Sequence, residues 1–272
     1  MKYILLCTAA LLVCFGLAWV LARFIGKRVL KRPGRLCTFL LTLLLGCGLI
    51  GAVSLIYLGD YYHADAAQVQ KAFSTPGVNV EQIDGGYRFD GPGENAALIF
   101  YPGAKVEATA YAPLLTEIAS RGIDCFLAEM PFNMAILGSS TADKFLESYS
   151  YDTWIAAGHS MGGMIISGFA SDHAEIGKIV LLAAYPTGEI EESKALCSIF
   201  GTEDNCLNQA AYESSKGGWP SQAEEHCIQG GNHAQFGAYG PQDGDGVAAI
   251  APEEQWEITA DIIFQFAEVP AP

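Results

Sequence analysis

The chain has 272 residues, enough for one large domain or two small ones, and its positive mean hydropathy is unusual for a soluble enzyme. The first 58 residues hold 7 of the 15 basic residues and no acid, so the remainder carries 8 basic against 30 acidic side chains, a formal charge of −22. Nucleic acid and anionic lipid repel such a domain, and without a basic cluster bearing interleaved aromatics a nucleic-acid-binding function is excluded.

Two apolar runs without any charged residue, 3–22 and 36–58, open the chain. Each reaches the roughly 20 residues that a helix needs to cross a bilayer core, so the sequence predicts two transmembrane helices. A cleaved signal peptide fits less well, because the first run lacks a small-residue cleavage site and a second run follows it. The triplet Ala64-Asp65-Ala66 has the form of a cleavage site, so later release of the remaining chain stays an alternative.

The connector between these runs, residues 23–35, is basic and contains no acid. Its charged residues are Arg23, Lys27, Arg28, Lys31, Arg32 and Arg35. Because basic loops stay on the cytoplasmic side, we expect the connector inside and both chain ends outside. The sequence therefore predicts a transmembrane hairpin (1–59), a polar linker (60–77) and an extracytoplasmic domain (78–272).

Cysteine usage indicates no metal site. Cys7, Cys14, Cys37 and Cys47 lie in the apolar runs, and Cys125, Cys197, Cys206 and Cys227 lie in the outer domain, where oxidation is possible. Neither a C-x-x-C motif nor a Cys/His metal spacing occurs, so no metal is predicted. Cys206 with Cys227 is the one disulfide candidate, and buried free thiols are the favoured alternative.

Strand-like and helical stretches alternate along the outer domain. Asp84-Gly85 separates the runs 78–83 and 86–89 and suits a tight primed turn, which predicts a hairpin. Strands are expected within 96–103, 123–131, 153–158, 177–186, 194–205 and 223–233, and helices at 108–122, 140–149, 161–172 and 252–269. This alternation predicts an α/β fold whose mostly parallel sheet is covered on both faces, with ligands bound at the carboxyl ends of the strands.

The stretch IAAGHSMGGMI, residues 155–165, places Ser160 between a predicted strand and a predicted helix. This is the setting of a nucleophile elbow, in which a catalytic serine occupies a sharp strand-to-helix corner. Gly158 and Gly162 lie two residues on either side, where small residues let strand and helix approach without clashing. We therefore predict Ser160 as a nucleophile.

A serine hydroxyl needs a base, usually a histidine that an acid orients. Of the five histidines, His233 lies in a Gly-rich loop just after the last predicted strand, whereas His226 falls within that strand. Asp204 begins the loop after the preceding strand, with Glu203 as its main rival. Ser160, Asp204 and His233 thus follow successive strand regions, and we predict them as a catalytic triad.

A triad of this kind also needs an oxyanion hole. One donor is expected to be the N–H of Met161, the residue after the nucleophile. The other is expected from the loop after the strand 96–101, where Gly103 lets the backbone turn. Ala104 is the predicted donor and Lys105 the alternative.

With these residues in place, the region from about 96 to 267 resembles an α/β-hydrolase. The segments YPGAKVEATAYAPLLTEIASRGIDCFLAEMP, GHSMGG, GTEDN and GGNHAQFGAYG resemble a membrane-tethered bacterial subgroup of that superfamily. The resemblance implies a Ser–Asp–His hydrolase with the triad named above, in a bacterial cell membrane. The connection between 178–184 and 195–200 is short where many relatives insert a cap domain, so an open site is expected. An apolar wall over it is expected from Phe132, Met134, Ile136 and Leu137, with plain core as the alternative.

The sequence as a whole predicts a membrane-anchored, multi-pass, extracytoplasmic serine hydrolase of the carboxylesterase type. We expect it to act through an acyl-enzyme on a small-molecule or lipid acyl ester, without a cofactor. Acyltransferase, thioesterase, amidase and peptidase activities on the same triad remain open, because a fold does not define its substrate. A non-catalytic binding protein that retains the fold is the alternative from another class.

Overall fold

The structure is a computed structural model that describes residues 2–29 and 34–268, with side chains from residue 11 onward apart from residue 29. Residues 30–33 of the predicted basic connector and the chain end at 269–272, with the last residue of the helix expected at 252–269, lie outside the described residues. The chain divides into two units, Met1–Asp60 and Tyr61–Pro272, and each is described by itself.

The first unit consists of two helices, α1 (Lys2–Val29) and α2 (Arg35–Gly59), which pack against each other. Ala18 and Ala22 are buried, and a Cβ on Gly46 would lie 2.5 Å from the ring of Phe15. Small residues are what allow apolar helices to approach this closely. Within the described residues, α2 is the one helix long and apolar enough to cross a membrane. The two-span hairpin therefore stays a prediction.

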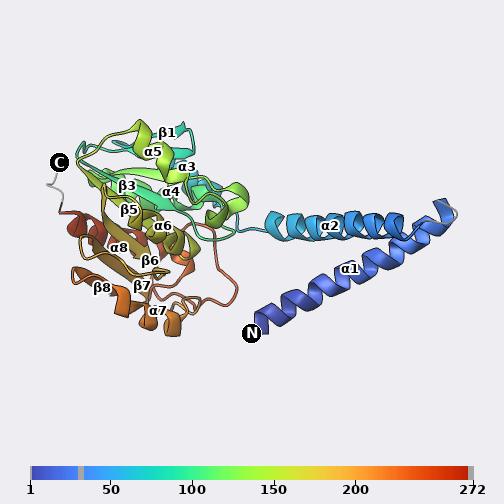
Figure 1. Ribbon diagram of the computed structural model, residues 1–272. Coiled ribbons are helices and arrows are strands. Elements are labelled where there is room, and N and C mark those ends of the chain that lie inside the picture. Colours follow the sequence, from blue (N-terminus) through green and yellow to red (C-terminus); the bar gives the residue numbers. More distant parts are fainter. Residues whose placement is uncertain (1, 30–33, 269–272) are drawn as a thin grey trace. The chain divides into compact units, whose positions relative to one another are not determined.

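The second unit is built around an eight-stranded sheet in the order β1-β2-β4-β3-β5-β6-β7-β8 (Figure 1). Its strands are β1 (Asn79–Ile83), β2 (Gly86–Asp90), β3 (Ala96–Tyr101), β4 (Asp124–Ala128), β5 (Thr153–His159), β6 (Ile176–Leu182), β7 (Ala195–Gly201) and β8 (Ala223–Ile228). The β1–β2 hairpin and the β2–β4 pair are antiparallel, and all the other neighbours are parallel. The predicted β-hairpin at the turn Asp84-Gly85 and the predicted mostly parallel sheet are confirmed.

Helices cover both faces of this sheet. They are α3 (Ala66–Phe73), α4 (Ala112–Ser120), α5 (Thr141–Ser148), α6 (Met161–Ser171), α7 (Gln209–Ser215) and α8 (Pro252–Ala267). One core layer joins α4 and α8 to side chains such as Leu98, and the other joins α5 and α6 to side chains such as Ile99. Successive strand residues point to opposite faces, so a strand buried on both sides is apolar throughout, as β3 is.

The segment 60–77, expected as a linker, folds onto the second unit from Tyr61 onward. Tyr62 forms a parallel bridge with Val106, because its N–H donates to the carbonyl of Lys105 at 2.7 Å and its carbonyl accepts from Glu107 at 2.9 Å. The side chain of Asp65 then caps α3 by accepting from two backbone N–H groups. The segment is therefore anchored at the same loop that is expected to supply an oxyanion donor.

Two further expectations concern connections and thiols. The stretch between β6 and β7 contains neither helix nor strand, so no cap domain is inserted there. Cys206 and Cys227 are free thiols in the structure, so the disulfide candidate is not formed. The favoured alternative of buried free thiols is right about the free thiols and wrong about burial, because Cys206 is half-buried and Cys227 is exposed.

Candidate active site

Ser160 stands at a strained corner between β5 and α6. Its backbone has φ 52° and ψ −123°, a left-handed conformation that residues other than glycine rarely adopt. Its N–H donates to the carbonyl of Leu182 on β6 at 2.9 Å, which holds the corner against the sheet. Strain of this kind is the mark of a nucleophile elbow, where it lifts the serine hydroxyl out of the sheet.

The two glycines flanking the corner are required by close backbone contacts. A Cβ on Gly158 would lie 2.6 Å from the backbone of Gly162. A Cβ on Gly162 would overlap the carbonyl oxygens of Tyr101 and Pro102, which belong to the end of β3 and the loop after it. Both positions must therefore be glycine for β5, α6 and the loop after β3 to pack this tightly.

Asp204 and His233 form a buried pair in the loops after β7 and β8. His233 Nδ1 lies 2.9 Å from Asp204 Oδ2, and the residues are 2% and 6% exposed. Asp204 Oδ1 accepts from the backbone N–H groups of Cys206 and Leu207 at 2.9 and 2.8 Å. Because the carboxylate can only accept, His233 Nδ1 carries the proton and Nε2 is left as an acceptor.

The neighbouring acid does not share this position. Glu203 is exposed, and its carboxylate accepts from the hydroxyl of Thr202 at 3.1 Å. Of the two acids that the sequence left as rivals, it is Asp204 that the structure brings to the histidine.

Ser160 is brought near this pair through its own neighbour in the chain. The ring of His159 lies with its centroid 4.5 Å from that of His233. Ser160 itself makes no side-chain hydrogen bond among the described residues. Nucleophile–base bonds are often loose without substrate and tighten only in the reacting complex, so this geometry is compatible with a catalytic role.

Sequence analysis gave no role to Tyr111 and His159, which are both fully buried behind the corner. Burial raises the pKa of the Tyr111 hydroxyl, so the hydroxyl keeps its proton. The backbone N–H of Gly103 donates to Tyr111 Oη at 3.0 Å, and His159 Nδ1 lies 2.7 Å from the same oxygen. The Tyr111 proton is therefore donated to His159, because the Gly103 N–H is not an acceptor.

The His159 ring is neutral at physiological pH. Burial and the neighbouring His233 both hold the pKa of His159 well below its ordinary value of 6.5. A neutral ring with Nδ1 as acceptor carries its proton on Nε2, on the edge that the Tyr111 hydroxyl does not occupy. Only the position of His159 beside Ser160 pointed to it in the sequence, and Tyr111 was hidden in a helical apolar pattern.

The two candidates for the second oxyanion donor both lie in the loop after β3 and differ in the hydrogen bonding of their N–H groups. Lys105 has φ 57°, and its N–H donates to the carbonyl of Asn133 at 2.8 Å, so this N–H is occupied. The N–H groups of Ala104 and Met161 make no backbone hydrogen bond within the described residues. Ala104 therefore remains as the predicted donor, and the alternative Lys105 is wrong.

The expected apolar wall lies in two short 3-10 turns after β4, Pro131–Asn133 and Ala135–Leu137. Phe132, Ile136 and Leu137 are each more than half exposed, and Met134 is half-buried. The second turn packs against α6, the helix that begins after Ser160. Plain core is therefore the wrong interpretation for the three exposed side chains.

A mostly parallel sheet with a strained serine after β5 and an acid–histidine pair after β7 and β8 defines the α/β-hydrolase class of protein. The sequence agrees with this class. Residues 97–257 match the alpha/beta hydrolase family, and the chain belongs to it.

No curated protein matches the sequence. Among solved structures, the chain is similar to the apo form of Thermogutta terrifontis esterase 2, at 13% identity and a TM-score of 0.48 over 72% of this chain and 97% of that one. It is also similar to a predicted CIB-like hydrolase from Thermoplasma acidophilum, at 14% identity and a TM-score of 0.48 over 69% of this chain and 98% of that one. At such identities the likeness concerns the fold alone.

Proposed function

We propose that this protein is a serine hydrolase that cleaves carboxylic ester bonds. Ser160 attacks the ester carbonyl while Nε2 of His233 takes its proton, and Asp204 stabilises the imidazolium that forms. The N–H groups of Met161 and Ala104 hold the oxyanion. The alcohol leaves with the proton from His233, and water activated by the same histidine then hydrolyses the acyl-enzyme.

One observation carries this proposal: a strained serine corner stands beside a buried histidine that an acid already orients. A binding protein does not need Ser160 at φ 52°, nor a carboxylate fixed by two backbone N–H groups to hold the His233 tautomer. Backbone strain and a buried charge both cost stability, and a catalytic function gives a reason for both.

We propose an ester with an apolar acyl group as the substrate. The exposed side chains of Phe132, Ile136 and Leu137 lie in turns of which the second packs on α6, so an acyl chain attached to Ser160 has apolar surface within reach. The lack of an inserted cap between β6 and β7 supports a site open to extended substrates. Esters are also the least demanding of the acyl bonds left open by the sequence.

We further propose that the first unit anchors the enzyme in a bacterial cell membrane with the second unit outside. Large apolar side chains of α1 and α2, such as Leu12, Leu44 and Ile56, are exposed all along the described helices. Exposing such an apolar surface to water would be unfavourable, whereas lipid tails would solvate it. The basic connector between the helices supports a cytoplasmic turn, and hence termini outside.

Labelling with a fluorescent fluorophosphonate tests the catalytic proposal on the full chain in detergent. We expect the unmodified protein to be labelled and Ser160→Ala not to be labelled. The control variant Ser171→Ala, which changes the serine at the end of α6, should be labelled like the unmodified protein. A protein that does not label, or Ser160→Ala that labels equally, would show that Ser160 is not the nucleophile. A panel of p-nitrophenyl esters of rising acyl length then tests the substrate class, with amide and thioester analogues as competitors.

Protease protection in sealed vesicles tests the topology. The second unit should be digested from outside in intact spheroplasts and protected in inverted vesicles. The opposite pattern would place the second unit in the cytoplasm and overturn the proposed orientation.

A further inference from the structure

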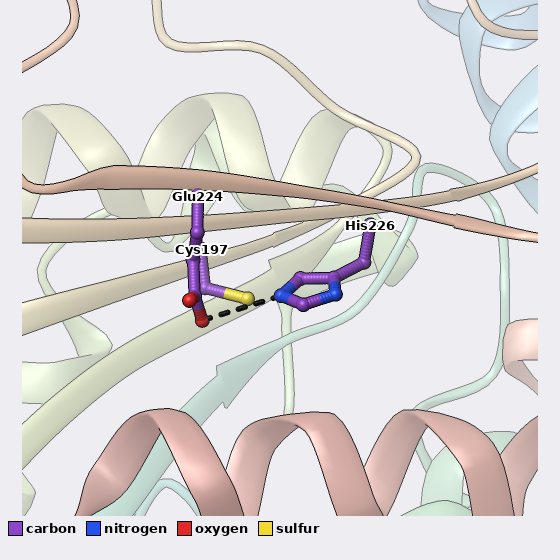
Figure 2. A group of neighbouring side chains, drawn as sticks. All are labelled: Cys197, Glu224 and His226. Carbon is purple, nitrogen blue, oxygen red and sulfur yellow. Dashed lines mark ion pairs between the residues drawn. The ribbon is translucent and has the colours of Figure 1, made fainter.

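Three potential metal ligands meet on β7 and β8, away from the proposed catalytic site. Cys197 of β7 is paired in register with Glu224 of β8, and His226 follows Glu224 on the same face of the strand (Figure 2). They lie before the carboxyl ends of these strands, whereas Asp204 and His233 follow those ends. The cluster is therefore separate from the triad.

The donor atoms are close enough to share one ion. One atom each from the thiol, the carboxylate and the imidazole lie within 4.8 Å of one another, and Glu224 Oε1 is 3.3 Å from His226 Nε2. In Figure 2 the sulfur of Cys197 and the near edge of the His226 ring point toward each other. Ligand atoms of a tetrahedral zinc ion at bond lengths of about 2.0–2.3 Å lie about 3.3–3.6 Å apart for one sulfur with nitrogen and oxygen ligands, so small side-chain rotations suffice.

The buried thiol of Cys197 makes this cluster different from an ordinary surface ion pair. Cys197 is fully buried, whereas the side chains of His226 and Glu224 are 37% and 46% exposed; the Nε2 atom of His226 is itself shielded from solvent and faces the Glu224 carboxylate without forming a hydrogen bond to it. Glu224 and His226 also line a cleft of about 430 Å³ between β8 and α8, which gives an ion a path from solvent. A shielded nitrogen that lacks a hydrogen bond costs free energy, and coordination of an ion shared with Glu224 and Cys197 would satisfy it.

The charges around the cleft favour a cation. The second unit is strongly acidic, and Lys178, which lines the same cleft as Glu224 and His226, is already engaged. Its Nζ donates to the carbonyls of Phe266 and Ala267 at 2.8 and 3.0 Å and lies 3.5 Å from the carboxylate of Glu268. The charge of Lys178 is thus offset at the end of α8.

We propose that Cys197, Glu224 and His226 bind one divalent transition-metal ion, with Zn²⁺ as the best match. Thiolate, imidazole and carboxylate are the ligands that zinc takes in proteins, and a water would complete the tetrahedron. On binding, the thiol proton passes to solvent and a metal–sulfur bond forms, with no change of oxidation state. The ion joins the edge strand β8 to β7 and thereby supports the two strands that lead into the acid and histidine loops.

The sequence offered no sign of this site because its ligands follow no local spacing. Cys197 is far from Glu224 and His226 along the chain, and only the parallel register of β7 and β8 brings them together. The expectation of no metal rested on the lack of a C-x-x-C or Cys/His motif, which a site shared between two strands does not need.

Calorimetric titration of the full chain in detergent with Zn²⁺ tests the proposal. We expect one ion per chain, and an affinity reduced in Glu224→Gln and His226→Gln by more than the roughly 10- to 100-fold that loss of an outer-shell partner costs. His173→Gln is the matched control, because His173 pairs with Asp143 at 3.0 Å on the surface without a thiol nearby. This variant should bind Zn²⁺ as the unmodified protein does.

Substitution with Co²⁺ adds a spectroscopic readout that reports the sulfur directly. The Co²⁺ complex should show a thiolate-to-metal charge-transfer band that Cys197→Ser abolishes. Cys227→Ser, which changes an exposed thiol on β8, should retain this band. If Cys197→Ser does not fold, the Zn²⁺ affinities of Glu224→Gln and His226→Gln decide the result. Absence of stoichiometric Zn²⁺ binding, or equal binding by Glu224→Gln and His226→Gln, would overturn the proposal.

Discussion

Replacing Asp204 with asparagine should abolish most activity by changing which nitrogen of His233 carries the proton. The carboxylate accepts two backbone N–H groups on Oδ1 and the histidine Nδ1–H on Oδ2. In asparagine one of these oxygens becomes an NH₂ donor. Turning the NH₂ toward the backbone would leave two buried N–H groups facing a donor, at a cost of about 1–3 kcal/mol each.

The alternative orientation is less costly and inactivates the base. If the NH₂ faces His233, the ring moves its proton from Nδ1 to Nε2 and accepts at Nδ1, so all of the hydrogen bonds survive. Nε2 then carries a proton and cannot accept the one from Ser160. We expect kcat to fall about 10⁴-fold, which corresponds to about 5.5 kcal/mol of transition-state stabilisation. The free energy of unfolding should change much less than the roughly 5.5 kcal/mol lost from transition-state stabilisation.

The assay is steady-state hydrolysis of a p-nitrophenyl ester, with the thermal midpoint of each variant measured alongside. Glu203→Gln is the matched control, since among the described residues the Glu203 carboxylate accepts a hydrogen bond only from the adjacent Thr202 hydroxyl. This substitution should change kcat less than about 2-fold. A loss of activity in Glu203→Gln with normal turnover in Asp204→Asn would refute both the assignment and the tautomer argument.

Three further predictions concern the corner and its support. Gly162→Ala should unfold the protein or lower its free energy of unfolding by more than the roughly 1–3 kcal/mol that overpacking usually costs, because the new Cβ would meet backbone oxygens. Gly168→Ala in the same helix is the control: its Cβ has open space, so thermal melts should show a neutral or stabilising effect. Tyr111→Phe and Tyr101→Phe each remove a buried hydroxyl with two hydrogen bonds, so both should lower the free energy of unfolding by about 1–3 kcal/mol. Only Tyr111→Phe should also lower kcat, while Tyr101→Phe should cause little loss of kcat. Because burial depresses the pKa of His159, the unfolded chain binds its proton first. Stability should fall as the pH drops below 6.5, and urea unfolding of His159→Gln should show a shallower loss.

The parts of the fold that depend on local pattern could be predicted from sequence. Ser160, Asp204 and His233 each follow a strand, and a strand end is marked by a change from apolar periodicity to glycine-rich or polar residues. The parallel sheet then brings such ends to one edge without further information. Position along the chain was therefore sufficient to bring the acid and histidine together.

The remaining features depend on register and packing, which a single sequence does not encode locally. Residues 61–77, which were expected as a linker, belong to the second unit because Tyr62 pairs with Val106. Only the folded loop after β3 showed that the N–H of Lys105 is taken by Asn133. In each case the deciding contact joins residues whose types carry no distinctive pattern.

The buried network behind the corner gives a physical reason why the site could work without a cap. Gly103, Tyr111 and His159 link the loop after β3 to the end of β5, and the His159 ring packs on His233 in the loop after β8. Both hydrogen bonds are buried, so shifting the loop after β3 alone would leave a polar group unpaired at a cost of about 1–3 kcal/mol, whereas the contact between His159 and His233 is ring packing. The loops proposed to carry the oxyanion donor, the nucleophile and the base are therefore joined through one buried cluster. Electrostatic catalysis requires such preorganisation, and under the proposed function the core behind the serine would supply it rather than a lid in front of the serine.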